Sequence, residues 1–208
     1  MHNTVENNID GMNSAQRALK RTGDCVGAFL GLLFLSPLFL VIYIMQKIEG
    51  EGPAIYKQER IGKGGLPFNI LKFRTMKVEA EKEGIPQLAQ KEDDRLTRLG
   101  KFLREHHLDE LPQLWNVFVG DMSFVGYRPE RKYFIDKIME HNPDYALLYV
   151  SRPGVTSYAT LYNGYTDTME KMLRRLDMDL DYLRKRSISM DLKIIFETVF
   201  SVGGGKKF

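Results

Sequence analysis

The feature that most constrains this chain is an uncharged run from Cys25 to Met45. Its length of about twenty residues is enough to cross the hydrocarbon core of a bilayer. It does not fit a secretory signal, because it is too long, no small-residue cleavage site follows it, and it leads directly into the remaining chain. Ser36-Pro37 lies in its middle, where the proline removes a backbone hydrogen bond and clashes with the preceding turn. The serine hydroxyl can bond to a backbone group freed in this way.

Basic residues stand on both sides of this run, namely Arg17, Lys20 and Arg21 before it and Lys47 and Lys57 after it. Neither side is therefore the Lys/Arg-poor side expected of a translocated end. One interpretation is a re-entrant helix that breaks at Ser36 and Pro37 and returns to the cytoplasmic face. The other is an ordinary spanning helix with a proline kink, and the segment alone leaves both open.

The re-entrant interpretation divides the chain into three parts. These are a flexible N-terminus over residues 1–16, a membrane helix over residues 17–48 and a cytosolic domain over residues 49–208. The length of 208 residues suffices for one core and one membrane segment. Cys25 is the single cysteine, so no internal disulfide can form, and we expect a reducing, cytosol-facing body.

The charge of the chain argues against a nucleic-acid partner. The net charge is only +3, and the basic residues are dispersed among acidic ones. A nucleic-acid binder would carry a denser basic stripe, with aromatic residues interleaved to stack on bases. The mild positive charge suits anionic lipid or nucleotide phosphates better.

Two β-type segments follow the apolar run, at residues 54–61 and 68–74, with a glycine-rich stretch between them. This arrangement predicts a β-hairpin. Helical spacing of apolar residues predicts helices over residues 97–106, 133–141 and 189–201. The fold class is therefore predicted as α+β and helix-dominated: a membrane helix, a hairpin and several amphipathic helices.

Three segments allow less definite predictions. Residues 78–94 are polar and charged, which is typical of a solvated helix or a mobile loop, and residues 151–155 resemble a turn. His106 and His107 have no further zinc ligand at suitable spacing. The last helix carries a stripe of Leu192, Ile195, Phe196 and Val199. Core packing is its default explanation, and shallow insertion into a membrane interface is the alternative.

Adjacent carboxylates at Asp109 and Glu110 are the most distinctive chemical feature. They precede Pro112, which suits a first helical turn because its missing N–H would have no partner there. A helix N-terminus stabilises negative charge and can hold a phosphate. An acidic nucleophile beside a phosphate is what phosphoryl transfer needs. The simpler alternative is that Asp109 only caps the helix.

Taken in order, the motifs of the chain resemble those of the bacterial sugar transferase family, the monotopic polyprenyl-phosphate phosphoglycosyl transferases. The resemblance runs from about residue 17 to about residue 200. The matching pieces are Lys20-Arg21-x-x-Asp24, Ser36-Pro37, Gly52-Pro53-Ala54-Ile55-Tyr56-Lys57-Gln58-Glu59-Arg60-Ile61-Gly62, Lys72-Phe73-Arg74-Thr75-Met76, Leu108-Asp109-Glu110-Leu111-Pro112-Gln113-Leu114, Gly120-Asp121-Met122-Ser123-Phe124-Val125-Gly126, Arg128-Pro129 and Arg152-Pro153-Gly154.

The resemblance implies a phosphoglycosyl transferase that works in two steps at the cytoplasmic face of the bacterial inner membrane. A UDP-sugar loses UMP to leave a phosphosugar on the enzyme, which then passes to undecaprenyl phosphate. This would be the first membrane step in assembling a polysaccharide or glycoconjugate. The implied partners are these two substrates and membrane phospholipids, and a homo-oligomer is compatible with them.

The resemblance also assigns residues. Asp109 matches the family's nucleophile and Glu110 its partner carboxylate, and Mg²⁺ is the family's metal, held at this pair. Substrate and phosphate contacts are implied for four basic residues: Lys72, Arg104, Arg128 and Arg152. A cation and basic side chains neutralise a diphosphate, while a carboxylate nucleophile divides one displacement into two.

The chain departs from the family where the sugar and base are expected to bind. Tyr127 replaces a proline, Ser157-Tyr158-Ala159-Thr160 replaces Gly-Trp-Ala-Gln, and Tyr165 replaces an arginine. Either Asp177 or Asp179 matches the family's downstream aspartate. These changes affect the choice of sugar more than the reaction.

Two other classes of function compete with the transferase. A non-catalytic membrane scaffold for other glycan-assembly proteins is disfavoured by the intact Asp109-Glu110, Lys72 and Arg104. A membrane-tethered nucleic-acid binder is disfavoured by the dispersed charge. Release of UMP from a UDP-sugar would separate the transferase from both.

Overall fold

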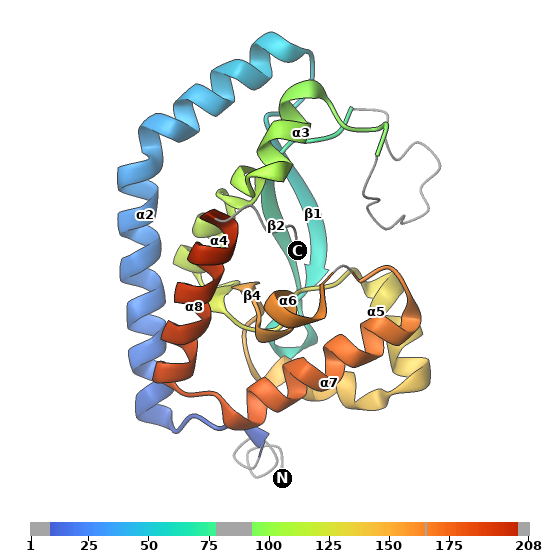
Figure 1. Ribbon diagram of the computed structural model, residues 1–208. Helices are drawn as coiled ribbons and strands as arrows, with labels where there is room; N and C mark the ends of the chain where they lie inside the picture. Colours follow the sequence, from blue (N-terminus) through green and yellow to red (C-terminus); the bar gives the residue numbers. More distant parts are fainter. Residues whose placement is uncertain (1–8, 78–92, 165, 204–208) are drawn as a thin grey trace.

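The computed structural model describes residues 9–77, 93–164 and 166–203. Its longest element is helix α2, Ser14–Glu49, and two short sheets and further helices pack along one side of it (Figure 1). The predicted class, α+β and helix-dominated, is confirmed. Most of segment 78–94, predicted as a solvated helix or mobile loop, lies outside the described residues.

The remaining elements follow in chain order. The first part of the body contains β1 (Ile55–Ile61), the 3₁₀ turn η1 (Lys63–Gly65), β2 (Pro67–Phe73), α3 (Arg98–Glu105), η2 (Leu108–Glu110), α4 (Gln113–Val119) and β3 (Ser123–Val125). The second part contains α5 (Lys132–His141), η3 (Pro143–Val150), β4 (Gly154–Thr156), α6 (Tyr158–Asn163), α7 (Met169–Lys185) and α8 (Ile188–Gly203).

Helix α2 bends but is not interrupted at Ser36-Pro37 (Figure 1). Pro37 has no N–H to donate to the carbonyl of Leu33, one turn earlier. The Ser36 hydroxyl donates to that same carbonyl at 2.8 Å. The Ser36 hydroxyl therefore replaces the backbone donor that the Leu33 carbonyl lacks. For this reason the predicted break is a bend in a continuous helix.

Both halves of α2 pack on the same body. In the first half, Asp24 accepts hydrogen bonds from the Ser123 hydroxyl at 2.7 Å and the Phe124 N–H at 3.2 Å. In the second half, Ile42 packs with Phe73, a buried residue of β2, in one apolar cluster. A helix that crosses a bilayer alone keeps its middle clear of the aqueous body, whereas this helix contacts that body on both sides of its bend.

The outer side of α2 is apolar and exposed, with Phe34 74% and Ile48 80% accessible. Within the described residues, α2 is the one helix long and apolar enough to cross a membrane by length and composition. A side chain such as Phe34 gains from leaving water. Helix α2 thus has an apolar outer side and a body-bound inner side, and its re-entrant arrangement stays a prediction.

Residues 1–16 were predicted as a flexible N-terminus; residues 1–8 lie outside the described residues, and residues 10–16 are ordered. Helix α2 starts at Ser14, and Asn13 forms a capping box with Gln16. Met12 is buried, and Asp10 forms an ion pair with Arg186 at 2.7 Å. Residues 10–16 therefore belong to the folded body, because a buried ion pair and a helix cap fix them.

The predicted hairpin is confirmed. Strands β1 and β2 are antiparallel, with Tyr56 opposite Lys72, and η1 forms their glycine-rich turn. A second, parallel pair, β3 and β4, was not predicted, and β4 begins inside the segment 151–155 that resembled a turn. Strands of three residues are too short to show a period in the sequence.

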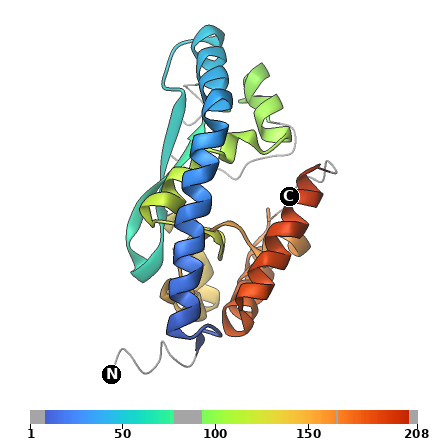
Figure 2. The same ribbon diagram turned by 90° about the vertical axis from the view of Figure 1, so that its left-hand side faces the viewer.

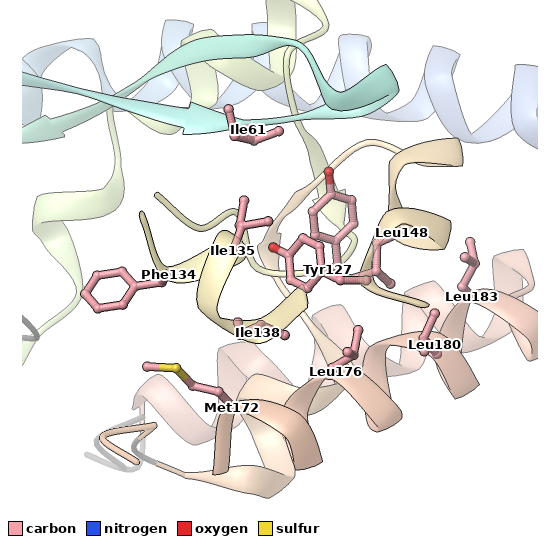
Figure 3. Close-up of a cluster of buried hydrophobic side chains, with 11 residues drawn as sticks. Ile61, Tyr127, Phe134, Ile135, Ile138, Leu148, Met172, Leu176, Leu180 and Leu183 are labelled. Atoms are coloured by element: carbon pink, nitrogen blue, oxygen red, sulfur yellow. The ribbon is translucent and has the colours of Figure 1, made fainter. Parts of the chain in front are cut away.

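The main core lies between the hairpin, α5, η3 and α7. Tyr127, Ile135 and Leu148 gather between Ile61 of β1 and the helix α7 (Figure 3). Helix α7 supplies its apolar side at helical spacing, and its buried residues include Leu176, Leu180 and Leu183. This core holds the segment after β3 in place, and that segment carries Arg128.

Three of the four residues of the stripe predicted on the last helix face outward, while the fourth, Ile195, is half-buried and packs against a core cluster. In α8, Leu192, Phe196 and Val199 are each more than 60% exposed, so core packing is wrong for these three. The buried side of α8 instead presents Ile194 and Asp191, and Asp191 pairs with Lys20 of α2 at 2.6 Å. The start of α8 accordingly lies beside the first half of α2 (Figure 2). Insertion of the outer side into a membrane interface stays a prediction.

The position of the two ends of α2 can be tested by thiol labelling in intact cells. Native Cys25 reports on one end, and Glu49→Cys in a Cys25→Ser background reports on the other. Because both halves of α2 contact one body, we expect both thiols to respond from the same side of the membrane. Labelling from opposite sides would contradict the re-entrant arrangement. Pro37→Ala should straighten the helix and shift the balance toward a spanning topology.

Candidate active site

The two adjacent carboxylates lie in the 3₁₀ turn η2, one turn before α4. Helix α3 ends at Glu105, and His107 adopts a left-handed conformation, with φ 54°, that turns the chain. Pro112 is the N-cap of α4, so the carboxylates precede this helix instead of forming its first turn. The predicted helix therefore starts about one turn later than the carboxylates, which lie in a separate 3₁₀ turn.

Strand β2 brings a lysine to these carboxylates. The Lys72 ammonium lies 2.7 Å from Glu110 Oε1, and an Arg128 guanidinium nitrogen lies 3.6 Å from the same oxygen. Burial would raise the pKa of Glu110, but the charges of Lys72 and Arg128 outweigh it and lower the pKa to about 2. Glu110 is thus a fixed anion that orients two cations.

Asp109 is in a different situation. It is 7% exposed, and burial raises its pKa, with the charge of Glu110 adding to the rise. Lys72 and Arg104 oppose this rise without cancelling it. The two neighbouring carboxylates are therefore unequal: Glu110 is stabilised as an anion, and Asp109 is the more basic of the two.

A pocket opens on the Glu110 side of this pair. It encloses about 260 Å³ when its open mouth is included, and its walls come from β1, β2, η2, α4 and the segments around β3 and β4. The lining residues are Arg60, Ile70, Lys72, Glu110, Gln113, Arg128, Pro129 and Gly154. Asp109, the neighbour of Glu110 in the chain, is not among these lining residues.

An ion-pair network holds the segment that carries Arg128. Glu130 is buried between Arg60, at 3.2 Å, and Arg175 of α7, at 2.7 Å. Burial would raise the pKa of Glu130, but Arg175 and Arg60 lower it below its usual value. Two arginines and one carboxylate thus tie β1 and α7 to the residues on either side of Pro129.

The structure distinguishes the two candidates for the family's downstream aspartate. Asp177 is exposed, whereas Asp179 is buried and accepts hydrogen bonds from the backbone of Arg128 and Ala159 and from Ser157. Burial raises the pKa of Asp179 to about 7 despite these bonds and the nearby Arg175. Asp179 therefore contacts the segment that carries Arg128, a residue of the pocket wall, and Asp177 does not.

Of the four basic residues predicted for the site, three are brought together. Lys72 and Arg128 line the pocket, and Arg104 is close enough to influence Asp109. Arg152 lies elsewhere: its Nε donates to the carbonyl of Gly120 at 2.7 Å, near Arg21 of α2. Its role in the structure is to join β4 to the turn after α4.

Close backbone contact between the segments of β3 and β4 requires glycine at two positions, Gly126 and Gly154. A Cβ on Gly126 would lie 2.4 Å from the carbonyl oxygen of Arg152, and one on Gly154 would lie 2.2 Å from the Gly126 nitrogen. Side chains at either position would push the two strands apart. The glycines thus allow β4 to approach β3 and place Gly154 in the pocket wall.

Sequence reasoning assigned no role to three residues that shape the site. Arg60 and Gln113 stand inside the quoted motifs, so their position in the chain was noted but not their contribution to the pocket. Arg175 stands outside the motifs, on a helix that was not predicted. Its signal was the helical spacing of Met172, Leu176 and Leu180 around it.

The carboxylate pair fits a magnesium ion that is completed by substrate. Among residues 9–77, 93–164 and 166–203, no group of three or more His, Cys, Asp or Glu side chains forms an all-protein metal site. Mg²⁺ is commonly held by one or two carboxylates together with substrate phosphates. Asp109 and Glu110 are the two adjacent carboxylates that would hold such a cation.

The model of the family described as "Bacterial sugar transferase" matches residues 15–205, and the chain belongs to this family. It is 41% identical over 191 residues to the UDP-glucose:undecaprenyl-phosphate glucose-1-phosphate transferase of Escherichia coli, covering 91% of this chain and 41% of that protein.

Two further relatives differ in length. A Caulobacter vibrioides protein with the same name is 44% identical, and the match covers 88% of this chain and 69% of that protein. The exopolysaccharide production protein PSS of Rhizobium leguminosarum is 38% identical, with 88% of this chain and 94% of that protein covered. The chain thus spans less than half of the Escherichia coli relative and almost all of the Rhizobium one.

The buried Asp179 predicts a specific dependence of stability on pH. The pKa of Asp179 is about 7 in the folded protein and 3.8 ordinarily. The stability that the protonated side chain contributes is therefore fully present below pH 3.8 and is lost as the pH rises toward 7. Asp179→Asn removes this titration. The advantage of wild type over the variant in the free energy of unfolding should shrink by up to about 4 kcal/mol between pH 4 and pH 7.

Chemical denaturation in detergent, followed by the fluorescence of Trp115, measures this difference. Asp177→Asn makes the same change at an exposed position of the same helix and should show no such trend. A difference between wild type and Asp179→Asn that does not vary with pH would contradict the raised pKa.

Proposed function

We propose that this chain transfers a phosphosugar from a UDP-sugar to undecaprenyl phosphate and releases UMP. The observation that carries the proposal is the unequal carboxylate pair, with Glu110 fixed by Lys72 and Arg128 and Asp109 buried beside it. The names of several relatives, which are UDP-sugar and undecaprenyl-phosphate transferases, support the same substrates.

In the first step, an Asp109 carboxylate oxygen attacks the phosphorus that carries the sugar. The bond from this phosphorus to the bridging oxygen breaks, and UMP leaves with that oxygen and the bonding electron pair. The product is an aspartyl phosphosugar. Asp109 is the better nucleophile of the pair because its anion is less stabilised than that of Glu110.

In the second step, a phosphate oxygen of undecaprenyl phosphate attacks the same phosphorus. The bond to the Asp109 oxygen breaks, the sugar-linked lipid diphosphate forms, and the carboxylate is restored. Two successive displacements therefore return the protein to its starting state without a proton held elsewhere.

The basic residues neutralise the reacting phosphates. Lys72 and Arg128 lie on the pocket side of Glu110, where the phosphates of a UDP-sugar would enter, and Arg104 lies near Asp109. A magnesium ion held at Asp109 and Glu110 would supply further positive charge to the phosphate oxygens. Positioned cations stabilise the charge of a phosphoryl-transfer transition state without having to reorganise.

The lipid substrate accounts for the outer side of α2. Undecaprenyl phosphate carries its phosphate at a membrane surface. Helix α2 runs along the rest of the fold (Figure 2), and the side chains on its outer side are apolar and exposed. We place the chain at the cytoplasmic face of the bacterial inner membrane, where nucleotide sugars are available. The re-entrant helix then keeps the carboxylate pair at the level of the lipid phosphates.

Substitution of the nucleophile tests the reaction. Asp109→Asn keeps the shape of the side chain but removes its charge, so turnover should be abolished while the melting temperature stays close to that of wild type. A residue that only capped a helix would change stability slightly and leave turnover normal. The measurement is UMP release over a panel of UDP-sugars with undecaprenyl phosphate, in detergent or nanodiscs.

Covalent trapping adds a second readout. Incubation of wild type with UDP-sugar and no lipid acceptor should place a phosphosugar on the peptide containing Asp109, detectable by mass spectrometry. Asp177→Asn is the matched control and should retain turnover and label. Normal turnover in Asp109→Asn, or label on another peptide, would exclude the assignment. A wild type that releases no UMP from any UDP-sugar would favour the non-catalytic scaffold.

Chelation tests the metal. Two carboxylates facing a diphosphate repel it unless a cation intervenes, so excess EDTA should abolish UMP release and added Mg²⁺ should restore it. Wild type is compared before and after dialysis against the chelator. Full activity in excess EDTA would show that Lys72 and the arginines alone neutralise the substrate.

A further inference from the structure

Two side chains that line the pocket each carry a buried hydrogen-bond donor without an acceptor among the described residues. The donors are Nε2 of Gln113 and Nε of Arg60. Gln113 is 2% exposed, so solvent does not compensate for its missing partner. A buried donor left unpaired costs free energy, which implies that an acceptor normally occupies the space in front of it.

The rest of the Arg60 guanidinium is already engaged. One terminal nitrogen donates to Glu130 at 3.2 Å, and the other donates to Gln58 at 2.6 Å. These contacts fix the plane of the group and leave Nε as the donor still to be satisfied. Glu130 and Gln58 therefore hold the Arg60 guanidinium in place, and its Nε–H is left to donate one further hydrogen bond.

The charge of the pocket lining favours an anionic acceptor. Three cationic side chains line the pocket, from Arg60, Lys72 and Arg128, against one carboxylate, that of Glu110. A diphosphate carries several anionic oxygens and fits the charge of this lining.

We propose that the Gln113 amide and the Arg60 Nε bind phosphoryl oxygens of the diphosphate in the pocket beside Glu110. The neutral amide adds a directed hydrogen bond among the three cations, which by themselves attract the charge but do not fix its orientation. This inference rests on the proposed function, because the UDP-sugar supplies the diphosphate. It adds two substrate-binding residues to Lys72, Arg104 and Arg128.

Direct binding of inorganic pyrophosphate and of UDP tests this proposal without turnover. Full-length wild type, Gln113→Leu and Gln113→Glu are titrated in detergent at a fixed Mg²⁺ concentration by calorimetry. Loss of a hydrogen bond to a charged acceptor should weaken both ligands about tenfold or more in Gln113→Leu. The new carboxylate in Gln113→Glu should weaken them further by repulsion.

Two other variants complete the design. Gln16→Glu makes the same amide-to-carboxylate change at the start of α2, where either residue can complete the capping box, and should bind as wild type does. Arg60→Lys keeps a positive charge for Glu130 but lacks Nε, so it should weaken pyrophosphate as Gln113→Leu does. If Gln113→Leu does not fold, as judged by its melting temperature, Arg60→Lys decides the outcome.

The results separate this proposal from the proposed function. Unchanged pyrophosphate affinity in Gln113→Leu or, where that variant does not fold, in Arg60→Lys would overturn the assignment. So would weakening of UDP alone, because the residues would then contact the nucleoside. The variants could lose pyrophosphate binding while the wild type releases no UMP. This result would support the diphosphate pocket and contradict only the transferase reaction.

Discussion

The seating of α2 on the body is the interaction on which the rest of the structure depends. Its inner side carries polar anchors at both ends: Asp24 holds the start of β3, and Gln46 donates to the carbonyl of Arg74 just after β2 at 2.7 Å. Glycines between these anchors permit close contact, since a Cβ on Gly27 would lie 2.9 Å from the Phe124 ring. One apolar helix therefore aligns the hairpin, α4 and β3, the elements that surround the pocket.

The chemistry of the site follows from the different electrostatic environments of two neighbouring carboxylates. Glu110 meets Lys72 and Arg128, while Asp109 is buried with weaker compensation. Adjacent residues in a tight turn point in different directions, so the fold can give them separate environments. Networks behind the pocket maintain this difference, because Glu130 and Asp179 fix the segment that presents Arg128.

The hairpin and several helices could be predicted because their residues alternate or repeat at regular intervals over seven or more positions. The β3–β4 pair could not, since each strand has three residues and its partner lies about thirty residues away. Helix α7 was missed although its leucines repeat at helical spacing, because charged residues separate them and lower the local apolar content. The outward stripe of α8 shows that helical spacing identifies a side of a helix but not what that side contacts.

The sequence by itself determined the apolar helix with its proline, the hairpin, the carboxylate pair and, through the order of its motifs, the family. These features are local or depend on ordered spacing, which a chain retains before it folds. Only the tertiary structure decided that Ser36 repairs the helix at Pro37, that Asp179 and not Asp177 contacts the site, and that Arg152 lies apart from it. Each of these outcomes depends on burial and on contacts between distant segments. Packing sets them, and the identity of a residue alone does not.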